Sequence, residues 1–411
     1  MLYREMGKTG DKLSILGYGC MRFPKKDGKI DIERTEAQIR RAIEAGVNYF
    51  DTAYVYPHSE EVLGEILAKG LRDKVKLATK LPAFLIQSYK GMESTLLTSL
   101  KRLQTDHIDY YLIHALNNFD GWQRMKDMGV VDFLQKQREA GRIDRIGFSY
   151  HGQTEEFKKI IDDYDWDFCQ IQYNYLDEYS QAGTEGLEYA GSKGLGVIIM
   201  EPLRGGLLAT RLPKEAWEVL EAGKGTRSPA ERALRWLWNH PQVTTVLSGM
   251  NGEDQIEENL RTADAALPLS LTNGELAEIG RARDIIIEKM KVGCTGCSYC
   301  MPCPAGVNIP LCFTYYNNKY LSDGAAESRM LYLSMTIGKD GEKPSYASLC
   351  KSCGKCEQHC PQHLPIRRHL KEVAREMEGF YFRPLCGAIH GYYRVKNRFS
   401  RKRASSSENG R

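Results

Sequence analysis

The sequence contains no long hydrophobic run. None of its segments approaches the roughly 18 consecutive apolar residues that a membrane-spanning helix needs, so no membrane span is expected. The first residues, MLYREMGKTGDKLSILGYG, carry charges throughout and lack the unbroken apolar core of a signal peptide. We therefore expect a cytoplasmic protein.

Cysteine is scarce in most of the chain. Two of the 12 cysteines, Cys20 and Cys169, occur before residue 290, and the others fall between Cys294 and Cys386. A secreted protein stapled by disulfides would distribute its cysteines through its loops. Clustering at short, fixed spacings instead indicates metal ligands.

Net charge is also small, at +4 over 411 residues, but it is unevenly distributed. Residues 381–411 contain eight Lys or Arg and one Glu, so this segment carries +7 and the rest of the chain sums to −3. A basic tail of this kind is usually only solvated. No nucleic-acid partner is expected from it.

Strand-like and helix-like segments alternate regularly over residues 13–262. The expected strands are residues 13–20, 48–53, 75–82, 108–116, 144–152, 167–174, 196–203 and 244–250. The expected helices are residues 34–46, 59–70, 92–103, 130–141, 154–164, 185–194, 228–240 and 254–263. Strict alternation over about 250 residues is typical of a (β/α)8 TIM barrel. The competing architecture, a doubly wound open sheet, would favour a G-x-G-x-x-G loop, which the sequence lacks.

Polar residues stand at or near the carboxyl ends of several expected strands, where the chemistry of such barrels takes place. They are Asp51, Lys80, His114, Ser149 and Gln170. Because these ends meet on one face of a barrel, the five side chains indicate a site.

Eight cysteines form two regularly spaced runs. The runs are Cys294-x2-Cys297-x2-Cys300-x2-Cys303-Pro304 and Cys350-x2-Cys353-x2-Cys356-x3-Cys360-Pro361. The second has the spacing of bacterial two-cluster ferredoxins, and the first is one residue shorter, so two [4Fe–4S] clusters are expected. Two all-cysteine zinc sites are the alternative, but paired triplets with a trailing Cys-Pro favour iron and sulfur.

In ferredoxins with this pattern, the fourth cysteine of each run binds the other cluster. By analogy, Cys294, Cys297, Cys300 and Cys360 would hold one cluster, and Cys350, Cys353, Cys356 and Cys303 the other. The remaining Cys20, Cys169, Cys312 and Cys386 are expected to be plain buried residues.

The expected domains follow from these patterns. They are a barrel over residues 1–265, a helical linker over 266–293, a mainly helical ferredoxin-like iron–sulfur domain over 294–378 and a basic tail over 379–411. Helical periodicity in the iron–sulfur domain is clear at residues 325–337 and 366–377.

Three segments resemble the catalytic segments of the aldo/keto reductases: FDTAYVY (residues 50–56), ATK (78–80) and LIH (112–114). The resemblance covers most of residues 1–265, including a hairpin-like start at residues 2–13. It implies an oxidoreductase that acts on a small-molecule carbonyl or alcohol with NAD(P)H.

The chemistry of four residues fits this resemblance. Hydride transfer to a carbonyl creates an alkoxide, which needs a proton and charge stabilisation. Tyr56 would donate the proton, and the Lys80 ammonium would lower the pKa of its phenol from about 10. Asp51 would pair with Lys80, and His114 would hydrogen-bond the carbonyl oxygen. The alternative is a structural Asp–Lys pair with two unrelated neighbours.

The resemblance also implies nucleotide contacts. Ser149 and Gln170 would contact the nicotinamide carboxamide. The residues expected to contact other parts of the nucleotide are Met200, Pro202, Leu203, Ser248, Gly249, Met250, Gln255, Glu258 and Asn259. Tyr150 replaces the usual Asn, and Met200 replaces the usual stacking tyrosine. Gly249 and Gln255 replace cations that bind the adenosine 2′-phosphate. Without those charge-assisted contacts, NADH should bind at least as well as NADPH.

Two alternatives concern the electron donor and catalysis itself. The clusters are expected to serve electron transfer or structure. A cluster passes one electron at a time, whereas a hydride carries two electrons, so the clusters cannot exchange electrons with a hydride donor directly. A flavin or a partner redox protein could therefore take the place of NAD(P)H, although no flavin motif is evident. A non-catalytic redox sensor or electron-transfer adaptor is the other alternative, and the four-residue site argues against it.

Overall fold

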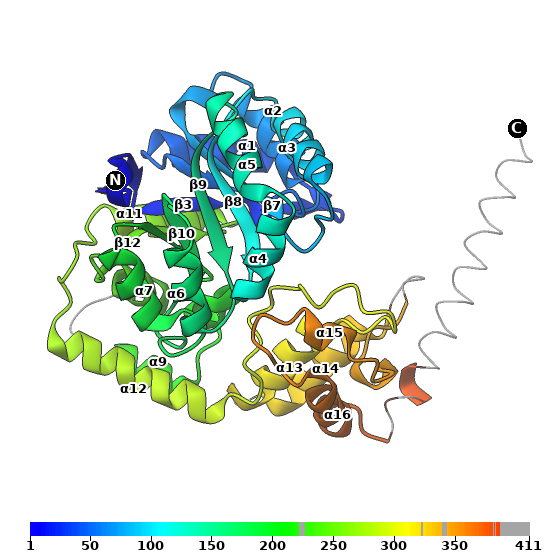
Figure 1. The fold of residues 1–411 in the computed structure, drawn as a ribbon. Helices are drawn as coiled ribbons and strands as arrows, with labels where there is room; N and C mark the ends of the chain where they lie inside the picture. The colour runs from blue at the N-terminus through cyan, green and yellow to red at the C-terminus, as the bar shows by residue number, and fades with distance from the viewer. Residues whose placement is uncertain (222–226, 322–323, 339–342, 381, 383, 387–411) are drawn as a thin grey trace, which may run out of the picture. The chain divides into compact units, whose positions relative to one another are not determined.

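A computed structural model describes residues 1–221, 227–321, 324–338, 343–380, 382 and 384–386 (Figure 1). They form two compact units: Met1–Leu203 with Gly223–Gly280, and Arg204–Ala222 with Arg281–Arg411. The helix expected within residues 266–293 is α12 (Asn273–Lys289), and the division between the units falls inside it. Most of the expected basic tail, residues 379–411, lies outside the described residues.

Eight parallel strands close into a barrel in the first unit and confirm the predicted architecture. The strands are β3 (Leu16–Gly19), β6 (Tyr49–Asp51), β7 (Lys76–Pro82), β8 (Ile108–Leu116), β9 (Ile143–Tyr150), β10 (Phe168–Gln172), β11 (Gly196–Met200) and β12 (Val243–Ser248). They follow one another around the barrel in chain order, and β12 closes the ring on β3.

The eight helices predicted between the strands are all present, outside the ring of strands (Figure 1). They are α1 (Ile32–Glu44), α2 (Ser59–Leu67), α3 (Tyr89–Leu103), α5 (Val130–Glu139), α6 (Thr154–Asp162), α7 (Gly183–Ser192), α10 (Pro229–Trp238) and α11 (Glu253–Ala263). Capping side chains explain where several of these helices begin. The side chains of Asp31, Ser88 and Ser228 accept hydrogen bonds from the first-turn amides of α1, α3 and α10.

Within residues 1–265, the structure describes three α-helices that were not predicted: α4 (Phe119–Asp127), α8 (Leu207–Thr210) and α9 (Lys214–Glu221). Helix α4 has nine residues, contains Gly121 and buries Trp122 and Met125. Such short segments show little periodicity, and packing stabilises them more than propensity does.

An amino-terminal hairpin contributes to the interior of the barrel. Strands β1 (Tyr3–Glu5) and β2 (Lys12–Ser14) pair in antiparallel fashion, as the sequence predicted. The apolar cluster inside the barrel includes Met6 and Leu13 beside Tyr49, Tyr110 and Phe168 from the first halves of the strands. The carboxyl halves are therefore left for polar side chains. A small second hairpin, β4 (Lys25–Lys26) and β5 (Lys29–Ile30), follows β3.

The second unit is mainly helical, as predicted. Its main elements are α13 (Ile309–Leu321), α14 (Ala325–Thr336), the short α15 (Lys355–Gln358) and α16 (Ile366–Met377). Helix α13 was not predicted, because its own aromatic and polar residues are distributed over all sides of the helix. Its sequence therefore shows no clear helical period. Its Phe313 and Tyr316 share a core with Tyr332 and Val373.

Among the described residues, no helix combines the length and the apolar character that crossing a bilayer requires.

Candidate functional site

Strand alternation places Asp51, Lys80 and His114 inside the mouth of the barrel. Each lies two residues after a member of the interior apolar cluster: Tyr49, Ala78 and Leu112, respectively. Successive side chains of a strand point to opposite faces, so residues two apart share a face. All three polar side chains are buried.

Lys80 is held by two acceptors. Its Nζ donates to Asp51 Oδ1 at 2.6 Å and to the Thr52 carbonyl oxygen at 2.7 Å. Burial raises the pKa of the Asp51 carboxyl, and the Lys80 ammonium opposes that shift. The pair therefore occupies a defined position at the ends of β6 and β7.

Tyr56 lies in the loop that follows β6, and its ring approaches two other site residues. The Lys80 Nζ is 5.4 Å from the centre of the Tyr56 ring. The Tyr56 and His114 rings are 6.0 Å apart, centre to centre, with an interplanar angle of 84°. The four residues expected from the sequence thus come together.

The His114 imidazole is neutral at neutral pH. Burial lowers its pKa well below the ordinary value, and the charges of Lys80 and His151 act in the same direction. The sequence pattern did not single out His151, although it lies two residues after Ser149 and so continues the same face past the end of β9. Burial lowers the pKa of His151 to about 4.

A buried chain of polar side chains anchors His151. Its Nδ1 lies 3.2 Å from Gln181 Oε1, and Gln181 Nε2 donates to Gln172 Oε1 at 2.6 Å. Gln172 Nε2 in turn donates to Asp177 Oδ2, which also accepts from Asn174 Nδ2. Of these residues, Gln172 carried a signal in the sequence, because it lies two residues after Gln170.

Three expected nucleotide residues lie on adjacent strands. Ser149 Oγ on β9 accepts a hydrogen bond of 2.8 Å from the Ala115 amide. Ala115 has a φ of 58°, and the register of β8 shifts around it. The Nε2 of Gln170 on β10 lies 3.6 Å from the sulfur of Met200 on β11. The Oε1 of Gln170 is buried and has no hydrogen-bond partner among the described residues.

The expected residues of the loop after β12 and of the following helix α11 differ in their hydrogen-bond partners. Asn259 Nδ2 donates to Ser248 Oγ at 3.0 Å and lies 3.7 Å from the sulfur of Met250. Glu258, the neighbour of Asn259 on α11, accepts from the Ser228 hydroxyl instead.

The other expected residues lie at the ends of strands and at a helix start. Gly249 directly follows β12, and Pro202 and Leu203 follow β11 within three residues. Gln255 caps the start of α11, where its Oε1 accepts from the Gly252 amide at 3.4 Å. A nearby cation, Arg34, is paired with Glu253 at 2.6 Å.

The cysteines gather in two groups within the second unit. A pocket there is lined by cysteines of both runs, namely Cys294, Cys297, Cys300 and Cys360. Burial raises the pKa of the Cys300 thiol, and the same three neighbours add to the shift. This grouping joins the first three cysteines of one run to the last cysteine of the other.

The complementary group contains Cys350, Cys356 and Cys303. Burial raises the pKa of the Cys356 thiol to about 11, and Cys350 and Cys303 contribute to the shift. Amide groups point at sulfur in both runs. The Gly296 amide donates to Cys294 Sγ and the Ser352 amide to Cys350 Sγ, each at 3.4 Å. Tight turns with amides directed at sulfur fit [4Fe–4S] clusters.

The four remaining cysteines, Cys20, Cys169, Cys312 and Cys386, are buried, as expected.

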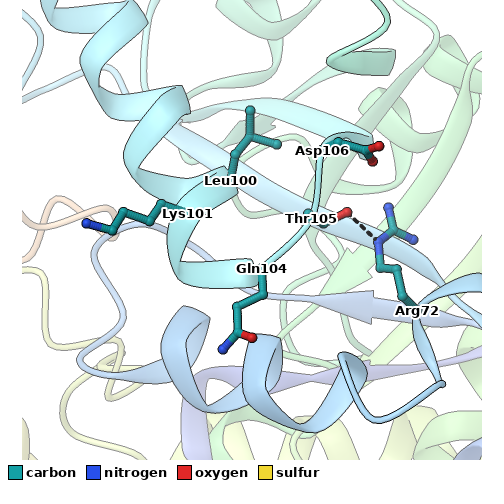
Figure 2. A pocket seen from close by; sticks show the side chains of 6 residues that line it. All are labelled: Arg72, Leu100, Lys101, Gln104, Thr105 and Asp106. Carbon is teal, nitrogen blue, oxygen red and sulfur yellow. Dashed lines mark hydrogen bonds between the residues drawn. The ribbon is translucent and has the colours of Figure 1, made fainter.

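A separate surface hollow on the first unit contains none of the expected site residues (Figure 2). Its lining residues are Arg72, Leu100, Lys101, Gln104, Thr105 and Asp106. Close by, ligand atoms of His107, Asp109 and Asp144 lie within 4.8 Å of one another. Asp109 already accepts from Arg72 and Lys76, whose charges would repel a metal ion. The group is therefore better described as an ion-pair network.

Comparison with known proteins identifies both parts of the chain. The model of the aldo/keto reductase family matches residues 15–273, more than half of the chain. The model of the 4Fe-4S dicluster domain matches residues 293–364.

Individual relatives agree with the first match. The chain is 28% identical to the uncharacterized oxidoreductase YrpG of Bacillus subtilis, over 65% of this chain and 92% of the relative. It is 27% identical to L-galactose dehydrogenase of Arabidopsis thaliana, over 70% and 95%. Among solved structures, an aldo-keto reductase from Bacillus halodurans in its holo form is similar, with a TM-score of 0.57 and 26% identity. That similarity covers 69% of this chain and 96% of the other.

Proposed function

Because the chain belongs to the aldo/keto reductase family and carries a 4Fe-4S dicluster domain, we propose that it interconverts a small-molecule carbonyl and its alcohol with a nicotinamide cofactor. The observation that carries this proposal is the convergence of Asp51, Tyr56, Lys80 and His114 at the mouth of the barrel. A structural Asp–Lys pair would not require a tyrosine and a neutral imidazole beside it.

The four residues divide the work of carbonyl reduction. Tyr56 gives its phenolic proton to the oxygen of the substrate, and the Lys80 ammonium stabilises the phenolate that this leaves. Asp51 keeps Lys80 charged inside the barrel. The neutral His114 donates an N–H to the same oxygen and orients the carbonyl without competing as a charged acid. In alcohol oxidation the proton moves in the opposite direction.

The nicotinamide, when bound, supplies or accepts the hydride. Ser149 Oγ accepts from the Ala115 amide, and its hydroxyl proton would be donated to the carboxamide oxygen of a bound nicotinamide. The buried Oε1 of Gln170 needs a donor, and a carboxamide NH2 group fits that need. Met200, whose sulfur lies 3.6 Å from Gln170 Nε2, would add an apolar side chain beside Gln170. Since Gly249 and Gln255 bring no cation, NADH binds at least as well as NADPH.

The cysteine groups of the second unit would hold two [4Fe–4S] clusters, which would transfer single electrons. Cys294, Cys297, Cys300 and Cys360 would hold the first cluster, and Cys350, Cys353, Cys356 and Cys303 would hold the second. The mixed lining of the pocket supports this crossed arrangement.

Deuterium labelling tests the proposed donor. With NADH that carries deuterium at C4 of the nicotinamide, direct hydride transfer puts the label on the carbonyl carbon of the product. Mass spectrometry of the alcohol measures it, using a panel of small aldehydes and ketones under anaerobic conditions. A product without label, formed only when a flavin or a redox protein is added, would overturn direct transfer and favour a cluster-fed reductase.

A further inference from the structure

The two cysteine runs differ sharply in charge. Residues 292–310, around the first run, contain no Asp, Glu, Lys, Arg or His. Residues 350–372, around the second run, contain five Lys or Arg and two Glu. The second run therefore lies in a positively charged segment, whereas the first lies in an uncharged one.

The second run also reaches the surface. Cys353 is exposed, while the other seven cysteines of the two runs are partly buried. Lys351 and Lys355, two residues before and after Cys353, are both exposed. A cysteine ligand at the surface provides a short path for electrons, since tunnelling requires close approach between a donor and the group that the cysteine binds.

Helix α16 adds further cations beside this loop. A methyl group built on Gly354 would lie 3.7 Å from the guanidinium carbon of Arg367. Lys371 lies four residues after Arg367 and is exposed, so both occupy the same face of the helix. The exposed loop and this face of α16 thus form one continuous surface.

The positive charge of this surface is only partly neutralised. Arg367 pairs with Glu357 at 2.7 Å, and Arg368 pairs with Glu372 at 3.2 Å. Within the part of the chain that the structure describes, no ion pair involves Lys351, Lys355 or Lys371. Three ammonium groups without an ion-pair partner among the described residues therefore remain on this surface.

We propose that the surface formed by Lys351, Cys353, Lys355, Arg367 and Lys371, called the basic face, docks an acidic one-electron carrier protein. The proposal rests on the proposed iron–sulfur function of the cysteines. One electron would leave the reduced carrier and enter the cluster that Cys303, Cys350, Cys353 and Cys356 would hold, and no proton or bond would be exchanged. The flow can also run in reverse, with the carrier as acceptor.

Charge complementarity is the reason for choosing this partner. Electron-transfer complexes are small and short-lived, and electrostatic steering raises their association rates by factors of about 10 to 1,000 at low salt. A basic face around a surface ligand gives that steering to an acidic carrier. The uncharged loop of the first run offers none.

Anaerobic stopped-flow spectroscopy on the full chain tests the proposal. The probe is a reduced acidic two-cluster ferredoxin, and the rate of reduction of the protein is measured between about 20 and 500 mM salt. We expect the second-order rate constant to fall about tenfold or more over this range. The variant Lys351→Glu/Lys355→Glu should lower the low-salt rate by a similar factor and remove most of the salt dependence.

Two controls separate docking from other effects. The variant Lys25→Glu/Lys343→Glu changes the net charge equally at two other exposed lysines and should react like the wild type. Reduction by methyl viologen radical, a small cation, should not slow in the Lys351→Glu/Lys355→Glu variant, because the added carboxylates attract a cation and repel only an acidic carrier.

Iron analysis distinguishes the two possible failures. Zinc in place of iron overturns the proposed clusters and the docking together. Iron content near eight, with no salt dependence or with an unchanged rate in the Lys351→Glu/Lys355→Glu variant, overturns the docking alone. Preferential binding of a fluorescent single-stranded oligonucleotide, lost in the same variant, would also overturn it in favour of a nucleic-acid surface.

Discussion

The Lys80 ammonium lies 2.6 Å from a carboxylate oxygen of Asp51, and both side chains are almost completely removed from solvent. Desolvating two charges costs nearly as much as their attraction returns, so a buried ion pair contributes little net stability. Its position beside Tyr56 and His114 agrees better with a chemical role than with a structural one.

Removing one member of this pair should be costly. Asp51→Asn leaves Lys80 buried without a counter-charge, and we expect a loss of about 3–5 kcal/mol in the free energy of unfolding. Asp51→Asn combined with Lys80→Met removes both charges and should recover much of that loss without recovering turnover. Urea unfolding followed by circular dichroism, together with a carbonyl reductase assay, measures both. A double variant with normal turnover would contradict the assigned roles.

Tyr56→Phe should lower turnover by roughly two orders of magnitude or more and leave nucleotide binding almost unchanged, because a general acid acts in the chemical step. Tyr54→Phe is the matched control, since Tyr54 lies in the same loop with its ring stacked on Arg102. Steady-state kinetics and fluorescence titration of NADH separate the two effects. Full activity in Tyr56→Phe would remove this residue from the mechanism.

His151 should make the barrel sensitive to acid. Burial lowers its pKa to about 4, so the folded protein keeps it neutral while the unfolded chain takes up a proton near pH 6.5. This part of the stability is complete above pH 6.5 and is lost as the pH falls toward 4. The loss reaches about 2 kcal/mol at pH 5.

Urea unfolding at pH 7 and pH 5 measures this dependence. His151→Asn, which keeps a donor near Gln181, should lose about 2 kcal/mol less than the wild type between the two pH values. His58→Asn, at an exposed position, should behave like the wild type. Equal losses in all three proteins would show that His151 does not titrate in this way.

The nucleotide preference should depend on the start of α11. The wild type should bind NADH at least as tightly as NADPH. Gln255→Arg should tighten NADPH by about tenfold or more, because it adds a charge-assisted contact to the 2′-phosphate, and should leave NADH unchanged. Gln153→Arg, at an exposed position on the same unit, is the control. A clear preference of the wild type for NADPH in fluorescence titrations would contradict this prediction.

Iron content tests the crossed ligand sets. The anaerobic wild type should contain close to eight iron and eight sulfide per chain. Cys297→Ser and Cys360→Ser should each remove about four iron, and combining them should remove no more, because both residues hold the same cluster. Cys303→Ser combined with Cys360→Ser should remove nearly all of the iron. Cys312→Ala, at a cysteine outside the two runs, should keep the full content.

The opposite pattern would indicate uncrossed runs. In that case the Cys297→Ser/Cys360→Ser double variant would lose both clusters. The Cys303→Ser/Cys360→Ser variant would lose both clusters in either arrangement. The Cys297→Ser/Cys360→Ser variant is therefore the one that distinguishes crossed from uncrossed runs.

Much of this protein was determined by local patterns in its sequence. The eight strands and their helices follow from hydrophobic periodicity, because buried strands and amphipathic helices leave repeats within about ten residues. The convergence of Asp51, Lys80 and His114 follows as well, since the strand ends of a barrel share one mouth. The two cysteine runs were equally visible, because adjacent cluster ligands lie within a few residues of one another.

Only the tertiary structure decided what depends on contacts between distant parts of the chain. The sequence did not assign residues 204–222 to the second unit, where Arg204 donates to the Gly293 carbonyl oxygen at 3.0 Å. It did not link His151 to Gln181, thirty residues away, or place Arg367 beside Gly354. Such contacts leave no period and no fixed spacing in the sequence. They exist because packing brings the segments together, and in this protein they anchor a buried histidine and build the charged surface around Cys353.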